Sequence, residues 1–206
     1  AFAALWMLVG GVAGLLEILL TLLATRPIGP VQTVTPGTLA NQVSYAGALI
    51  GIGLLVWLIH WGLALRFTAR DQIGERRSGI RKLYLYAVLL VGGVVLVYQS
   101  RNLLIDLLGL LFGLDSLSEM LTGNVLPPLS SVIAVGVIWI YHARIARLDA
   151  QIVSEAGAGA TLRRWCMYLL AVVGLVLLIV NMVDLLQTLV ERLAPTNGEV
   201  ITNGQW

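Results

Sequence analysis

The sequence predicts an all-α integral membrane protein, a helical bundle of about five transmembrane helices built from repeated helical hairpins. Its composition is the first reason: 58% of the 206 residues are hydrophobic, 12% are charged and the mean hydropathy is +0.89. A soluble core could not bury that much apolar surface. Apolar stretches of membrane-spanning length recur along the chain, whereas barrel strands would be about half as long and alternating. The third reason is an internal repeat.

A shift of 82 residues places one part of the chain on another without a gap. The matched pairs include Trp57 and Trp139, His60 and His142, Arg81 and Arg163, Gly92 and Gly174, and Asn102 and Asp184. Because the register holds from one helix across a loop into the next, we interpret it as a duplication with a period of 82 residues. It divides the chain into a half-repeat (1–42) and two hairpin repeats (43–124 and 125–206). It also predicts a further helix and basic loop before Ala1.

Five spans are expected in order along the chain. They are Phe2–Ala24, Val43–Leu65, Leu83–Leu111, a segment from after Pro128 to Ala143, and Trp165–Val190. The first is long enough to cross a hydrocarbon layer of about 30 Å. Three prolines and two glycines between Thr25 and Gln42 favour a loop. A polar tail follows from Pro195 onwards.

The distribution of basic residues predicts the topology. Ten of the 13 Lys and Arg residues lie in two segments, 66–82 and 144–164, while the link Phe112–Gly123 carries Asp115 and Glu119 and no basic residue. By the positive-inside rule the two basic segments are cytoplasmic. We therefore expect a multi-pass protein of the bacterial inner membrane with its N-terminus inside and its C-terminus outside. The basic loops could contact anionic lipid, and nucleic acid is not an expected partner.

Two histidines are the candidate cofactor-binding residues. The repeat places His60 and His142 at the same depth on two different helices. Two facing imidazoles could hold a haem or a chlorin as axial ligands. The alternative is a pair of interfacial histidines that hydrogen-bond backbone or lipid and lie among aromatic residues for the same reason.

A polar band is predicted in the outer half of the membrane. Its members are Glu17, Gln99, Arg101, Asn102, Asp106, Asn181 and Asp184. Ionisable groups at such depth have to point into the bundle and pair, so we expect an ion pair of Arg101 with Glu17 or Asp184. The band could be interhelical glue, with each hydrogen bond contributing about 0.6 to 2 kcal/mol. It could also be a proton path or an ion site.

Catalysis is not expected. The chain has no Gly-rich phosphate loop, no His-Glu-x-x-His motif and no cysteine pair, and the single Cys166 is expected to pack as a small apolar residue. The glycines at Gly10, Gly11, Gly92 and Gly93 are expected to let helices approach closely. We therefore predict no catalytic residues, no metal site and no enzyme activity.

One stretch carries a resemblance to a known family. It reads Trp57-x-x-His60-Trp61, then Glu75-Arg76-Arg77-Ser78, then Arg81-Lys82-Leu83-Tyr84-Leu85-Tyr86. This pattern resembles a bacterial family of repeated multi-pass membrane domains of unknown function. The resemblance is best from Trp57 to Gly113 and implies the repeat architecture and a bacterial origin, but no activity.

The function expected from the sequence is an accessory or scaffolding subunit of a larger inner-membrane complex, with other integral membrane subunits and lipids as partners. A small chain with little mass outside the membrane and few polar helix faces favours this interpretation. Two alternatives stay open. One is a haem- or chlorophyll-type pigment-binding subunit in electron transfer or photosynthesis, using His60 and His142. The other is a small transporter or proton channel that uses the polar band.

Overall fold

The computed structural model describes residues 1–25, 36–71, 73–113, 116–117, 125–153 and 157–193. Its helices are α1 (Phe2–Thr25), α2 (Pro36–Arg70), α3 (Gly74–Arg77), α4 (Gly79–Leu111), α6 (Leu126–Ile152) and α7 (Ala158–Leu193). Within these segments there is no β-strand, and five helices are long and apolar enough to cross a membrane. The prediction of an all-helical protein with five spans is therefore confirmed. The predicted outer loop (26–35), Asp115, Glu119 and the polar tail lie outside the described residues.

The helices are longer than the sequence pattern predicted. The start of α2 is at Pro36 rather than Val43, because proline suits the first helical position, where its missing N–H is not needed. The predicted loop 66–82 is mostly helical, since α2 continues to Arg70 and α4 begins at Gly79. The C-terminal extension of α6 to Ile152 follows from the good helix formers Ala, Arg, Leu and Gln after Ala143.

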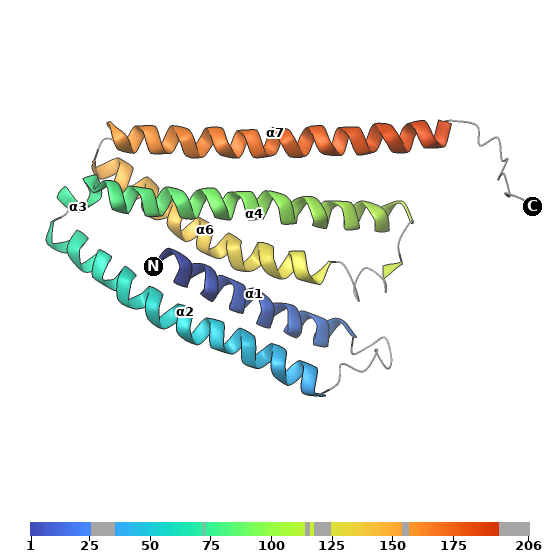
Figure 1. Cartoon of the computed structure of the whole chain (residues 1–206), viewed down its shortest axis with the longest axis horizontal. Helices are drawn as coiled ribbons and strands as arrows, with labels where there is room; N and C mark the ends of the chain where they lie inside the picture. The colour runs from blue at the N-terminus through green and yellow to red at the C-terminus, as the bar shows by residue number, and fades with distance from the viewer. Residues whose placement is uncertain (26–35, 72, 114–115, 118–124, 154–156, 194–206) are drawn as a thin grey trace, which may run out of the picture. The chain divides into compact units, whose positions relative to one another are not determined.

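The chain divides into two compact units, Ala1–Leu170 and Ala171–Trp206. In the first unit α1 lies between α2 and α6, and α4 packs along the other side of α6 (Figure 1). The start of α7 also belongs to this unit, and its Cys166 is buried as expected. The described part of the second unit is the remainder of α7, which carries Asn181 and Asp184.

The core of the first unit lies where α1, α4 and α6 meet. It consists of Leu5 and Val9 from α1, Val88 from α4, and Ala134 and Val135 from α6. Most other large apolar side chains are exposed, as they are on helices that face lipid. The core fixes the rotation of α4 and α6, and so determines which of their polar side chains meet at the helix ends.

The contact between α1 and α2 depends on two glycines. A Cβ added at Gly11 would lie 2.7 Å from the carbonyl oxygen of Ala46, and one added at Gly53 would lie 2.6 Å from the backbone N of Leu8. Backbone atoms cannot move aside as a flexible side chain can. These positions therefore require glycine for the close approach. The packing predicted for Gly11 is confirmed, whereas Gly10 is exposed and an added Cβ there meets no atom within 4 Å.

Candidate functional site

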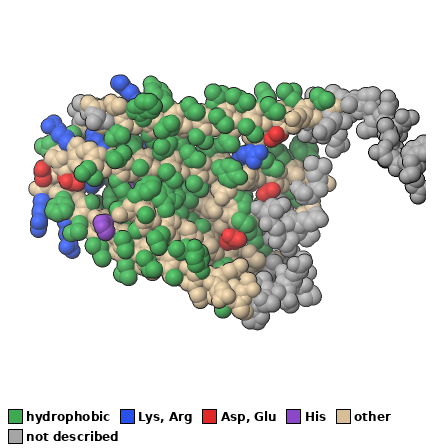
Figure 2. Space-filling view, viewed as in Figure 1, with side chains coloured by type: hydrophobic (Ala, Val, Ile, Leu, Met, Phe, Trp, Pro, Cys, Tyr) green, Lys and Arg blue, Asp and Glu red, His purple; other side chains and the backbone are tan. Residues whose placement is uncertain are grey.

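The candidate site is one end of the first unit, which we call the basic end. It is formed by the C-terminal turns of α2 and α6, by α3, and by the N-terminal turns of α4 and α7. Its basic residues are Arg66, Arg70, Arg76, Arg77, Arg81, Lys82, Arg144, Arg147, Arg163 and Arg164. Figure 2 shows Lys and Arg gathered at this end and apolar side chains over the face beside it.

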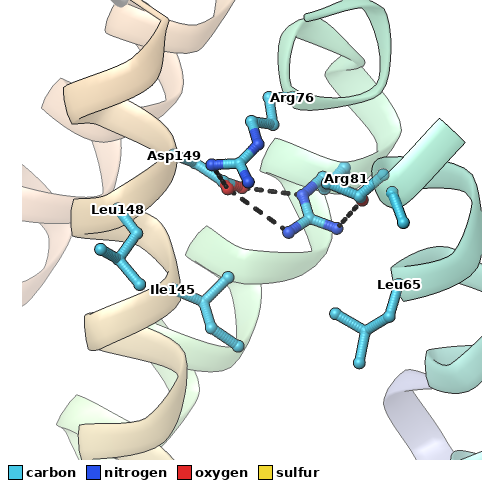
Figure 3. Close-up of a pocket in the computed structure, with 8 residues that line it drawn as sticks. Leu65, Arg76, Arg81, Ile145, Leu148 and Asp149 are labelled. Atoms are coloured by element: carbon cyan, nitrogen blue, oxygen red, sulfur yellow. Dashed lines mark hydrogen bonds and ion pairs between the residues drawn. The ribbon is translucent and has the colours of Figure 1, made fainter. Parts of the chain in front are cut away.

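Asp149 joins three elements in an ionic cluster at the basic end (Figure 3). Nε of Arg81 donates a hydrogen bond of 2.7 Å to Oδ2 of Asp149, and Nη1 of Arg76 lies 3.4 Å from Oδ1. Nη1 of Arg81 also donates to Oγ1 of Thr68 at 2.8 Å. The cluster thus ties the start of α4 to the ends of α2 and α6 and to α3.

The Arg81–Asp149 pair is buried, with side-chain exposures of 4% and 7%. Two desolvated charges are stable only when they pair with good geometry. Arg81 meets this condition through Asp149, Thr68 and the face of Trp61, whose ring centroid lies 5.6 Å from the guanidinium carbon. Removal of Asp149 would leave a buried cation, and such losses cost about 3 to 5 kcal/mol.

An aromatic cluster lies beside the ionic one. Trp57 and Trp61 both belong to α2, and their rings stack on each other. The ring of Trp61 also contacts Tyr84, Tyr141 and His142. Nε1 of Trp61 donates to the hydroxyl of Tyr141 at 2.8 Å. The cluster therefore fixes α2, α4 and α6 relative to one another next to the ionic cluster.

The hydrogen bonds around His142 determine which ring nitrogen carries the proton. Nε1 of Trp57 can only donate, so the Tyr84 hydroxyl accepts its bond of 3.0 Å and can direct its own proton to Nε2 of His142 at 3.3 Å. Nδ1 of His142 lies 2.8 Å from the carbonyl oxygen of Ile138, which can only accept. Nδ1 of His142 therefore carries a proton, and both ring nitrogens have hydrogen-bond partners.

The structure places the two predicted cofactor ligands in different environments. His142 is 0% exposed, whereas His60 lies on an exposed part of α2 and no ring contact joins the two among the described residues. Both nevertheless make the same local bond, since Nδ1 of His60 lies 2.7 Å from the carbonyl oxygen of Val56. An axial ligand needs a bare nitrogen, so His142 would have to give up Tyr84. Ligation of haem or chlorin by this pair stays a prediction.

The polar band is distributed over several places. On α4, Arg101 donates to Asn102 and Asn102 donates to Gln99, at 3.2 and 3.3 Å. Arg101, Asn102 and Asp106 line a pocket of about 350 Å³ that also reaches α6.

Glu17 lines a different pocket of about 210 Å³, formed by α1 and α2. The ion pairs seen among the described residues are those of Arg76 and Arg81 with Asp149, and the pair of Glu17 with Arg101 stays a prediction. Asn181 and Asp184 lie in the second unit, where Asn181 donates to the carbonyl oxygen of Leu177. The pair of Arg101 with Asp184 stays a prediction.

The two long sides of α2 differ, and we name them by their residues. The inner face consists of Ala46, Gly53, Trp57, Trp61 and Thr68. The outer face consists of Ala40, Ser44, Gly47, Ala48 and Gly51, all of which are exposed. Around Gly47 and Gly51 no atom of the described chain lies within 4 Å of an added Cβ. Two glycines in a Gly-x-x-x-Gly pattern, with open space above them, form a surface onto which another helix can pack closely.

Sequence reasoning had missed Asp149 at the basic end and the outer face of α2. Asp149 lies between Arg144, Arg147 and Arg163 in a segment read only for its positive charge. A lone acidic residue at the end of an apolar helix was the available signal for a buried ion pair. The spacing of Gly47 and Gly51 was the signal for the outer face.

These features define a multi-pass helical membrane protein whose polar residues at one end are joined into a cluster. Residues 1–129 match the model of a family described as Domain of unknown function (DUF5671), and the chain belongs to that family. The match covers α1 to α4 and the first turn of α6. No curated protein and no solved structure matches the chain.

Proposed function

We propose that the protein is a non-catalytic accessory subunit that holds together a larger assembly in the bacterial inner membrane. The outer face of α2 carries this proposal. Its small residues leave a shallow strip about three turns long, and large apolar side chains such as Tyr45, Ile52 and Leu55 are exposed next to it. Association of helices in lipid depends on close van der Waals packing, which small residues allow. The partner is an apolar helix of another integral membrane subunit.

The contact between α1 and α2 supports this role. There the same helix already uses a glycine, Gly53, to bring a neighbouring backbone within packing distance. The outer face repeats the chemistry, and at Gly47 and Gly51 no neighbouring atom of the described part of the first unit lies within packing distance. With α1 on the inner face and a partner helix on the outer face, apolar surface would be buried on both sides of α2.

The proposed orientation has the basic end in the cytoplasm. The ten basic residues gathered there support it by the positive-inside rule. In this orientation the N-terminus is inside and the C-terminus outside. The matching local bonds of His60 and His142 support the 82-residue repeat, since equivalent positions make equivalent contacts.

The test is extraction of the protein from its native membrane in a mild detergent, followed by the mass and composition of what co-purifies. We expect the wild-type chain to bring other integral membrane subunits in a fixed ratio. The double variant Gly47→Leu with Gly51→Leu should lose them, because leucine fills the space that a partner helix would occupy.

Gly10→Leu is the matched control. It makes the same substitution at an exposed glycine of α1, where an added Cβ also meets no atom within 4 Å. This variant should keep the partners. Recovery of the wild type alone, or partners retained by the double variant, would contradict the proposal.

A further inference from the structure

A pocket of about 360 Å³ opens at the basic end beside the ionic cluster. In Figure 3, Ile145 and Leu148 project from α6 on one side and Leu65 projects from α2 on the other. Arg76 and Arg81 converge on Asp149 at one end of this space. The pocket thus combines a charged end with apolar walls.

The charged end has an excess of positive charge and unused donors. One carboxylate, Asp149, faces two guanidinium groups. The donors of Arg81 are directed at Asp149 and Thr68. By contrast, Nε and Nη1 of Arg76 are buried and make no hydrogen bond with the described residues; Nη1 has only its ion pair with Asp149, and Nε has no partner among those residues. Buried donors of a charged group are costly to leave unused, so Arg76 is suited to an anion that enters the pocket.

The walls and the depth indicate what kind of anion this is. The pocket lies at the last turns of two apolar helices, where the headgroups of a bilayer meet the hydrocarbon. Phosphate oxygens match the planar fork of an arginine. Free phosphate has the same oxygens, but it would leave Leu65, Ile145 and Leu148 uncovered.

We infer that this pocket binds an anionic phospholipid. Its phosphate accepts a hydrogen bond from Nε of Arg76, while Nη1 keeps its ion pair with Asp149, and the first carbons of its chains pack against Leu65, Ile145 and Leu148. Arg81 and Asp149 hold the end of the pocket in place and do not release their own bonds. This site goes beyond the proposed assembly role and uses no residue of the outer face.

The test is native mass spectrometry of the purified, delipidated chain in detergent, titrated with phosphatidylglycerol, phosphatidylcholine or inorganic phosphate. We expect phosphatidylglycerol to bind more tightly than phosphatidylcholine. Arg76→Gln should weaken phosphatidylglycerol binding about tenfold, because a charged hydrogen-bond donor is lost. Arg77→Gln is the matched control, since it removes the same charge from the next, exposed residue and should change binding less than about twofold.

Leu148→Trp keeps every charge and fills the apolar part of the pocket. Leu148 is half exposed, so the larger ring can be accommodated, and phosphatidylglycerol binding should again fall. Equal losses in Arg76→Gln and Arg77→Gln would overturn the inference in favour of unspecific charge attraction. Binding of inorganic phosphate without preference for phosphatidylglycerol, or undiminished binding in Leu148→Trp, would also overturn it.

Discussion

The inner and outer faces of α2 both contain glycine, but the glycines have different surroundings. Gly53 on the inner face lies against the backbone of α1, whereas Gly51, two residues earlier and about 200° around the helix, meets open space. Further along, the inner face continues with Trp57, Trp61 and Thr68, which bond to α4 and α6. The comparison teaches that glycines of one helix can differ in surroundings: the inner face packs against α1, α4 and α6, whereas the outer face is exposed in the first unit and is the surface to which we assign a partner.

The largest expected effect comes from the aromatic part of the inner face. Trp61→Ala removes a side chain that is 4% exposed and contacts Arg81, Tyr84 and His142. We expect a loss of about 3 to 5 kcal/mol in the free energy of unfolding, measured by SDS titration in mixed micelles. His60→Ala, at the exposed neighbouring position, should change it by less than about 0.5 kcal/mol. Similar losses of unfolding free energy in Trp61→Ala and His60→Ala would contradict the expectation that the inner face stabilises the fold more than the exposed side of α2.

A smaller effect is expected from the glycines. Gly53→Leu places a side chain where even a Cβ would lie 2.6 Å from a backbone nitrogen of α1, so the helices must move apart. The expected cost in the same titration is about 3 kcal/mol. Gly51→Leu should leave the unfolding midpoint unchanged. A stable Gly53→Leu variant would show that α1 and α2 do not need this close approach.

The smallest effect is expected at the basic end of α2. Thr68→Val keeps the shape of the side chain but removes the acceptor for Nη1 of Arg81, which should cost about 1 to 2 kcal/mol. Ser44→Ala also removes a hydroxyl without adding volume, on the exposed outer face, and serves as the control. If the two variants unfold at the same SDS fraction, the Thr68 bond adds nothing to the cluster.

The sequence was sufficient for the class of fold but not for the neighbours of each helix. Five spans follow from apolar length, and the packing role of Gly11 follows from small-residue spacing. The pair of Arg81 with Asp149 could not be predicted, because it depends on which helix ends come together across 68 residues of chain. The C-terminal boundaries of α2 and α6 were underestimated because charged helical ends look like loops when only hydropathy is considered.

At the candidate site, too, the sequence predicts which residues are present but not how they are placed. The aromatic and histidine cluster was visible in the sequence, yet the burial of His142 and the exposure of His60 depend on how each helix is rotated. Their equal positions in the repeat gave no sign of this difference. The glycines of α2 likewise differ in role only because α1 covers one side of the helix.

The distance along the chain between Arg81 and Asp149 also bears on how the protein is made. Synthesis proceeds from the N-terminus, so α4 enters the membrane before Asp149 exists. Until α6 is complete, the guanidinium of Arg81 lacks its carboxylate partner, and only its partners on α2, Thr68 and Trp61, are already present. The ion pair that fastens the two helices together forms only when the last turns of α6 arrive, so the basic end closes late in biogenesis.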